Sequence, residues 1–196
     1  MTPLGNALSR ITGDLAESKT PFALVGGLAV SARTEPRFTR DADIAVIVDS
    51  DEQAEELVYS LKAAGYSIDT LVEQESVSRL ATVRLSPAGA DLSGIVVDLL
   101  FASSGIEREV VENAERLRVL EGIEVPVARV SHLIALKVLS RDDVKRPQDL
   151  VDLRALLKVA SETDLNEARK ACALIAERGY ARGRDLQRDF ESLLQH

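Results

Sequence analysis

Two aspartates at the start of a short apolar run constrain the fold of this chain more than any other feature of its sequence. Asp41 and Asp43 open the run at residues 41–48 (DADIAVIV), whose continuous β-branched stretch predicts a buried strand. Residues two apart in a strand point the same way, so both carboxylates share one face. Because like charges repel and burial makes each anion costlier, the pair indicates a bound cation.

The residues that precede this strand are typical of a phosphate site. Carboxylate oxygens on a short rigid element suit Mg²⁺, or Mn²⁺, shared with the phosphates of a nucleoside triphosphate. Upstream, an apolar strand at residues 22–25 runs into Gly26 and Gly27 and then into a helical segment at residues 28–32. Bare glycine backbone at a helix N-terminus binds anions. Three arginines, whose fork geometry suits phosphate oxygens, lie between the glycines and the aspartates: Arg33, Arg37 and Arg40.

The order strand, Gly-Gly, helix, Arg37-x-Thr39-x-Asp41-x-Asp43, strand resembles the signature of the nucleotidyltransferase fold of polymerase β-like enzymes and antibiotic-modifying transferases. The Arg-x-Thr-x-Asp-x-Asp form is most similar to AbiEii/AbiGii-type toxin nucleotidyltransferases. The resemblance implies an α/β (α+β) fold, with a small mixed sheet flanked by helices. This sequence departs from the family pattern at one position. Many family members carry a serine or threonine after a glycine of the pair, whereas here Leu28 follows Gly27. A phosphate contact there must therefore come from backbone amides.

A third acid, Asp98, stands inside a second apolar strand predicted at residues 94–102. Acids are almost never fully buried without a partner, so Asp98 requires one. One interpretation pairs it with Arg84, on a neighbouring strand predicted at residues 78–85. The resemblance favours the other, in which Asp98 joins the first two aspartates as the third metal ligand. It would then also accept the proton of the attacking hydroxyl.

Lys137 is the one charge on a nearly apolar helix predicted at residues 132–140. A snorkelling side chain is one interpretation. However, the later sequence Arg146-Pro-Gln-Asp149-Leu-Val-Asp152 resembles an AbiEii-type motif in which a helical lysine faces the triphosphate. Asp149 and Asp152 share a helical face, so they either fix Lys137 or Arg146, or complement the helix dipole. Taken together, the resemblance assigns nucleotide binding to Gly26, Gly27, Arg37, Thr39 and Lys137.

The remaining sequence predicts helices around the strands. We expect helices near residues 4–15, 51–64 and 106–117, two short strands at a sheet edge within 119–127, and two helices within 161–196 that are separated near Gly179. The catalytic core is predicted at residues 1–128, with a helical C-terminal region at 129–196 packed on it.

Composition narrows the function. The 24 basic and 32 acidic residues give a net charge of −8, which argues against binding long nucleic acid by bulk charge. The single cysteine, Cys172, cannot form an internal disulfide and is predicted to be a core residue. Two histidines exclude a His-rich metal site. No apolar run approaches the ~20 residues of a membrane helix, and no secretory signal is present, so we expect a cytoplasmic protein.

The expected reaction transfers a nucleoside monophosphate from a triphosphate to a hydroxyl or phosphate acceptor and releases pyrophosphate. The toxin-like resemblance implies a tRNA acceptor and an antitoxin protein as partner. A small antibiotic-type acceptor, or a catalytically inactive nucleotide-binding module, stays open. Basic residues predicted to contact the acceptor are Arg33, Arg40, Lys145 and Arg146.

Overall fold

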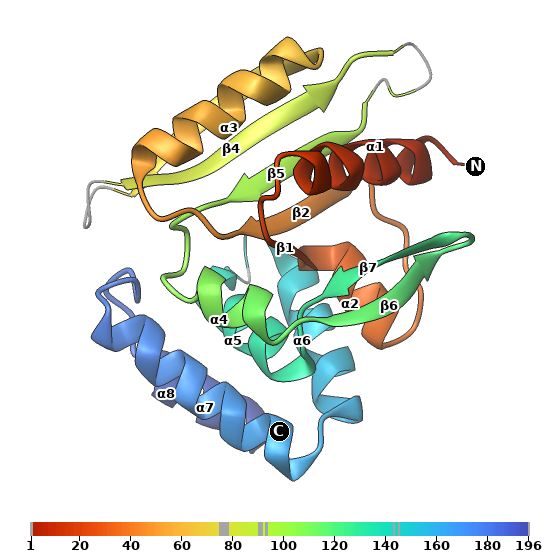
Figure 1. Ribbon diagram of the computed structural model, residues 1–196. Coiled ribbons are helices and arrows are strands. Elements are labelled where there is room, and N and C mark those ends of the chain that lie inside the picture. The colour runs from red at the N-terminus through yellow and green to blue at the C-terminus, as the bar shows by residue number, and fades with distance from the viewer. Residues whose placement is uncertain are drawn as a thin grey trace.

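A mixed β-sheet organises the structure, which is a computed structural model that describes residues 2–74, 79–89, 92, 94–142, 144 and 146–195. The sheet of these residues has seven strands in the order β3-β4-β5-β2-β1-β7-β6 (Figure 1). The strands are β1 (Phe22–Val25), β2 (Asp41–Val46), β3 (Tyr66–Gln74), β4 (Arg79–Pro87), β5 (Val96–Leu100), β6 (Glu115–Leu120) and β7 (Ile123–Val127). The predicted mixed sheet flanked by helices is therefore confirmed.

The central strand β2 carries the predicted aspartate pair. It runs antiparallel to β1, where Val25 lies opposite Asp43, and parallel to β5, where Asp43 lies opposite Asp98. Residues opposite one another on neighbouring strands project their side chains from the same face of a sheet. The register alone thus brings Asp98 beside the first two aspartates.

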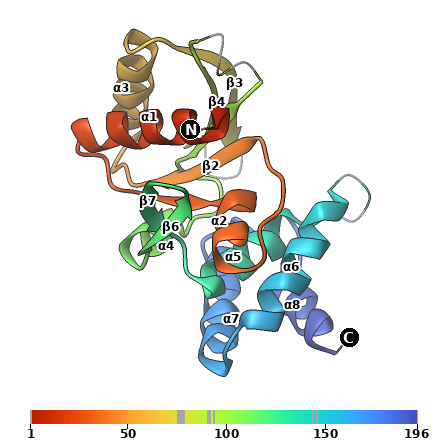
Figure 2. The ribbon, with the colours of Figure 1, turned by 90° about the vertical axis from the view of Figure 1, so that its right-hand side faces the viewer.

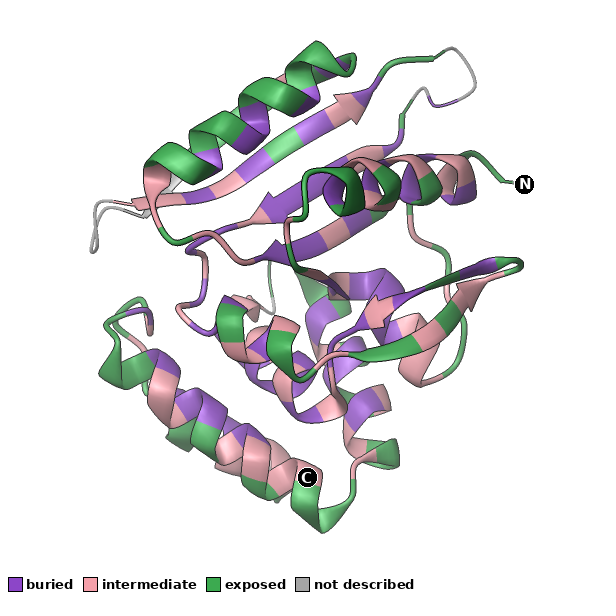
Figure 3. Ribbon diagram, viewed as in Figure 1, coloured by how far each residue is buried: buried purple, intermediate pink, exposed green. Residues whose placement is uncertain are grey.

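Two helices cover the sheet near its upper strands. Helix α1 (Pro3–Glu17) begins after Thr2, whose hydroxyl accepts the Gly5 N–H at 3.1 Å, and it buries Leu8 and Ile11. Helix α3 (Asp51–Ala63) begins after Ser50, which caps it, and it ends before Gly65, as predicted. Figure 3 shows the buried positions of both helices on the sides that face the strands.

The helical C-terminal region gathers on the other side of β1, away from α1 and α3 (Figures 1 and 2). It contains α5 (Val130–Ser140), α6 (Pro147–Val159), α7 (Glu162–Glu177) and α8 (Leu186–Leu194), while α2 (Gly26–Arg33) and α4 (Glu107–Glu112) lie nearer the sheet. One hydrophobic core joins sheet residues such as Leu24 to Ile134 and Phe190. Cys172 belongs to this core, and burial raises the pKa of its thiol to about 12. The boundary between the catalytic core and the C-terminal region, at residues 128/129, stays a prediction.

Three details of the fold differ from the sequence prediction. The helix predicted at 106–117 is wrong in its second half, because α4 ends at Glu112 and β6 begins at Glu115. Within the described sheet, β6 is an edge strand that pairs with β7 across a turn at Gly122, which has φ 75°. The predicted edge hairpin is therefore present and extends further than expected. Strand β3 was missed because this edge strand has few buried residues and no apolar alternation.

The other boundaries moved by a few residues. The strand predicted at 94–102 is shorter, and the one predicted at 78–85 runs from Arg79 to Pro87 and pairs antiparallel with β5, as a hairpin requires. Ser78 lies outside the described residues. Within the described part of the chain, no helix is both long and apolar enough to cross a membrane.

Candidate active site

All eight residues predicted for the site line a single pocket of about 530 Å³ between the sheet and the C-terminal helices. They are Gly26 and Gly27 at the start of α2, Arg37 and Thr39 in the following loop, Asp41 and Asp43 on β2, Asp98 on β5, and Lys137 on α5. The pocket therefore collects residues from three separate stretches of the chain: residues 26–43, β5 and α5. Convergence of charged groups in a cavity of this size is typical of a ligand site.

The carboxylates of β2 and β5 form the acidic wall of the pocket. Burial, followed by the charge of Asp98, raises the pKa of Asp43 to about 6; Asp41 adds to this effect, and Lys137 and Arg146 oppose it. The Thr39 hydroxyl accepts the backbone N–H of Asp41 at 3.3 Å, so it helps to set the start of β2. The acidic wall thus carries the charge repulsion that the sequence indicated.

Arg84 on β4 reaches this wall and holds Asp98. Its Nε and Nη2 donate to the two Asp98 oxygens at 2.9 and 2.7 Å. The hydrogen bonds that Arg84 donates to Asp98 raise the pKa of Arg84, and the charges of Asp41 and Asp43 act in the same direction. The pairing of Asp98 with Arg84 is therefore observed, and Asp98 also lies opposite Asp43, whereas its role as a metal ligand stays a prediction.

The donor atoms of the acidic wall fit a hard divalent cation, which prefers carboxylate oxygens. The side chains of Asp41 and Asp43 accept no hydrogen bond within the described part of the chain. Nevertheless, the described His, Cys, Asp and Glu residues include no group of three that could hold a metal ion as placed. Arg84 donates a hydrogen bond to each oxygen of the third carboxylate, that of Asp98. The metal-ligand role of the three aspartates therefore stays a prediction.

Positions 26 and 27 require glycine, because neighbouring side chains approach the backbone closely there and because Gly26 has a positive φ. Gly26 has φ +64°, and a Cβ added there would lie 2.5 Å from Cγ of Asp43. A Cβ added at Gly27 would lie 3.1 Å from Cζ of Arg37 and nearer still to its Nη2. The missing side chains leave the space that Asp43 and Arg37 fill.

Asp152 and Asp149 on α6 hold the two basic residues that were predicted to bind the triphosphate. Arg37 donates two hydrogen bonds to Asp152, and the Lys137 ammonium lies 2.6 Å from Asp149 and 2.8 Å from Asp152. Asp152 is only 1% exposed. Of the alternatives that the sequence left open, fixing Lys137 is observed, and Asp149 also lies in the first turn of α6, where it complements the helix dipole. Arg146 has no ion pair with either acid, while Arg37 is a partner the sequence did not indicate.

The basic residues predicted to contact an acceptor have different surroundings. Arg33 pairs with Glu115 at 2.7 Å and donates to the carbonyls of Val127 and Ala128, so its charge is already engaged. The Arg40 guanidinium lies 5.5 Å from the ring centre of Phe38. Neither arginine lines the pocket, whereas Arg146 does, and Lys145 lies outside the described residues.

Arg182 also lines the pocket, although the sequence gave no reason to expect it. It lies in the connection between α7 and α8, roughly at the far end of the chain from the glycine pair, and belongs to no recognisable motif. The only local signal is its position between Gly179 and Gly183, both of which have positive φ and mark a turn.

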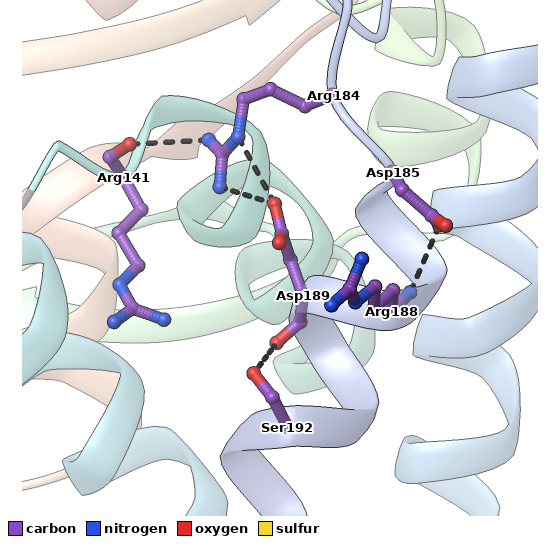
Figure 4. A pocket seen from close by; sticks show the side chains of 6 residues that line it. All are labelled: Arg141, Arg184, Asp185, Arg188, Asp189 and Ser192. Atoms are coloured by element: carbon purple, nitrogen blue, oxygen red, sulfur yellow. Dashed lines mark hydrogen bonds and ion pairs between the residues drawn. The ribbon is translucent and has the colours of Figure 1, made fainter.

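A second polar cavity, of about 660 Å³, lies near the start of α8 (Figure 4). Its lining residues are Arg141, Arg184, Asp185, Arg188, Asp189 and Ser192. Arg184 and Asp189 are paired with each other at 2.6 Å, and the Asp185 side chain accepts the N–H of Arg188 as the cap of α8. These contacts join C-terminal elements to one another, so we assign this cavity a structural role.

A comparison with protein families gives a match over nearly the whole chain. The model described as "Nucleotidyl transferase AbiEii toxin, Type IV TA system" matches residues 8–195. The match spans all the elements that line the pocket, including the connection that carries Arg182. A search of the curated proteins found no match.

Two solved structures share the fold at low sequence identity. An antigenic nucleotidyltransferase-like protein from Paracoccidioides brasiliensis has 18% identity and a TM-score of 0.53, with 98% of this chain and 92% of that chain covered. The antibiotic-resistance factor ANT(2'')-Ia has 16% identity and a TM-score of 0.55, with 89% and 92% covered. Both likenesses extend over most of this chain, which confirms the predicted fold.

Proposed function

Because the chain belongs to the AbiEii nucleotidyltransferase family, we propose that it transfers a nucleoside monophosphate from a nucleoside triphosphate to a hydroxyl or phosphate acceptor, with release of pyrophosphate. The observation that carries this proposal is the register between β2 and β5, which sets Asp43 opposite Asp98 at the wall of a pocket that also holds the glycine pair and Lys137. Acidic and basic groups that face one cavity suit a substrate with both a metal and phosphates.

Asp41 and Asp43 would hold Mg²⁺ or Mn²⁺, and Asp98 would join them after its release from Arg84. A divalent ion bound there supplies charge that stabilises the entering and leaving oxygens of phosphoryl transfer. Support comes from the raised pKa of Asp43, since a carboxylate that burial and like charges disfavour gains most from a cation. Thr39 keeps Asp41 in place through its backbone N–H.

The triphosphate would lie along the glycine pair, between Arg37 and Lys137. Gly26 and Gly27 offer backbone amides at the start of α2, where the helix dipole favours an anion. Arg37 and Lys137 are already oriented by Asp152, so their positions do not have to be organised when substrate binds.

The chemical step would be an attack of the acceptor oxygen on the α-phosphorus. The bond from that phosphorus to the bridging oxygen breaks, and pyrophosphate leaves. Asp98 would take the proton of an attacking hydroxyl, a role that again requires Arg84 to give up at least one of the two oxygens it holds.

The acceptor is proposed from the family description, which names a toxin of a toxin–antitoxin system. We expect an RNA of tRNA size, contacted at one end, because the net charge of −8 disfavours a long nucleic-acid footprint. Because the same family description names a toxin–antitoxin system, we propose an antitoxin as the protein partner.

The test is an incubation of the protein with each α-labelled ribonucleoside triphosphate, Mg²⁺ and a cell extract, resolved by size. Label from one triphosphate should appear on a tRNA-sized species and be lost with Asp43→Asn. Glu124→Gln, which changes an exposed acid on β7 that does not line the pocket, is the matched control and should keep the activity. Label only on small molecules would overturn the RNA acceptor, and no label on any fraction would overturn the transferase.

A further inference from the structure

The basic side chains that line the pocket fall into two groups. Arg37, Arg84 and Lys137 are each bound to a carboxylate, at 2.8 Å or less. Arg146 and Arg182 have no ion pair with any carboxylate of the described residues, although they line the same pocket. The pocket therefore holds two positive charges that the described protein does not neutralise.

Arg146 and Arg182 line the same pocket, from the start of α6 and from the connection between α7 and α8. Burial, followed by the charge of Arg146 and then that of Arg184, lowers the pKa of Arg182, while Glu107 opposes this weakly. Among the described residues, the Arg182 guanidinium makes one hydrogen bond, which its Nη2 donates to the carbonyl of Ser103 at 3.1 Å. A guanidinium has five N–H donors, so most of its donors are left for a ligand.

The backbone at Arg146 adds to this positive region. Arg146 is the residue before α6, and Pro147 and Gln148 in the first turn of that helix also line the pocket. The N-terminal end of a 13-residue helix carries a partial positive charge. The charge of Arg146 is also felt at Asp43, where it lowers the pKa, so this region faces the acidic wall.

The connection that carries Arg182 is anchored on both sides. Before it, Arg178 pairs with Glu109 at 2.6 Å and donates to the carbonyl of Gly105. After it, the Arg184 guanidinium donates to the carbonyl of Arg141 and to Asp189 (Figure 4), and also to the carbonyls of Val138 and Leu139 at the end of α5. Arg182 itself has φ +54°, a conformation that a residue with a side chain adopts only when its surroundings impose it.

We propose that Arg146 and Arg182 form an anion-binding subsite that takes a phosphate group, separate from the phosphates held beside the glycine pair and Lys137. The inference rests on the nucleotidyltransferase function proposed above for the identity of the ligand. Two neighbouring guanidinium groups without a carboxylate partner repel each other, and a phosphate between them removes this cost while accepting several hydrogen bonds. The phosphate belongs either to the nucleoside triphosphate or to the backbone of an RNA acceptor.

The test compares Arg146→Met, Arg182→Met and the double variant with the parent. Arg154→Met is the matched control, because Arg154 is exposed on the same helix α6 and does not line the pocket. The probes are each ribonucleoside triphosphate with Mg²⁺, followed by calorimetry, and a single-stranded RNA nonamer of mixed sequence with a fluorescent label, followed by anisotropy. Unfolding midpoints of all variants check that the fold is kept, and Arg182→Lys keeps the charge.

Each single variant should weaken binding of one probe about tenfold, the equivalent of about 1.4 kcal/mol, and Arg182→Lys should weaken it less. Loss confined to the triphosphate assigns the subsite to the nucleotide. Loss confined to the RNA, with a salt slope reduced by about one per arginine, assigns it to the acceptor. Binding of both probes equal to that of Arg154→Met would overturn the subsite.

The binding measurements do not depend on transfer, so the two proposals fail separately. If the parent binds the probes through both arginines but labels no acceptor, the subsite proposal stands and the transferase proposal is rejected. If the parent labels an acceptor while the methionine variants bind both probes as tightly as the parent does, the transferase proposal stands and the subsite proposal is rejected.

Discussion

Arg37 donates two hydrogen bonds, both of 2.8 Å, to the carboxylate of Asp152, which lies 115 residues further along the chain. The same carboxylate binds Lys137 at 2.8 Å. Although burial raises it, the hydrogen bonds from Arg37 and Lys137 lower the pKa of Asp152 overall. Asp152 thereby connects the loop before β2, helix α5 and helix α6, and it sets two cations on the pocket wall.

The first prediction concerns this carboxylate. Asp152→Asn should lower the free energy of unfolding by about 3–5 kcal/mol, because it leaves Arg37 and Lys137 without the anion that compensates them. Urea denaturation at pH 7.5 measures the loss. The control is Glu112→Gln, which breaks an exposed pair with Arg108 and should cost less than about 0.5 kcal/mol. Equal losses in the two variants would contradict the assigned role of Asp152.

The second prediction concerns Gly26. Gly26→Ala should cost at least about 1–2 kcal/mol, since the positive φ disfavours a side chain and the Cβ would overlap Asp43. It should also abolish the thermal shift caused by Mg²⁺ and a triphosphate. Gly13→Ala is the control, because Gly13 is an exposed position of α1 with nothing within 4 Å of an added Cβ. That change should stabilise the helix by about 0.5–1 kcal/mol, so a loss there comparable to that of Gly26→Ala would count against the argument.

The third prediction uses the pKa of Asp43, which is about 6 in the folded protein and about 3.9 in an unfolded chain. Since the folded pKa is the higher one, the contribution of Asp43 to stability is fully present below pH ~4 and is lost as pH rises through about 6. Asp43→Asn should therefore gain stability relative to the parent over this interval, reaching about 2–3 kcal/mol above pH 7. Urea unfolding of both proteins in EDTA across this range measures the difference. If the difference in the free energy of unfolding between Asp43→Asn and the parent does not change with pH, the pKa of Asp43 is not raised in the folded protein.

The fourth prediction concerns Arg84. In EDTA, Arg84→Met should lose about 1 kcal/mol, a modest figure because the Arg84 side chain is 47% exposed and solvent screens its pair with Asp98. Mg²⁺ should then raise the melting temperature of the variant more than that of the parent, because Asp98 is free to join the other two aspartates. Arg79→Met, which removes another arginine of β4 that pairs with Asp51, is the control. If Mg²⁺ shifts the parent, the control and Arg84→Met equally, Arg84 does not compete with the metal.

Much of the sheet and of the acidic wall could be predicted from the sequence, because both depend on short-range rules. The period of two in a strand puts Asp41 and Asp43 on one face, and an apolar run predicts where each buried strand lies. These rules failed for β3 and for the first part of β6, the two edge strands, because each is covered by a neighbour on one side only and therefore carries a weak apolar pattern.

The sequence by itself determined the set of charged residues and the short elements that carry them: the aspartates of β2, the acid within β5, the glycine pair and the helical lysine. Only the tertiary structure decided which cation meets which anion, since Arg84 pairs with Asp98 and Asp152 gathers Arg37 and Lys137. It also set Arg146 and Arg182 in one pocket without an ion pair to any carboxylate of the described residues. The physical reason is that an ion pair forms within about 4 Å, and partners far apart in sequence reach that distance only through the order of strands and the packing of helices.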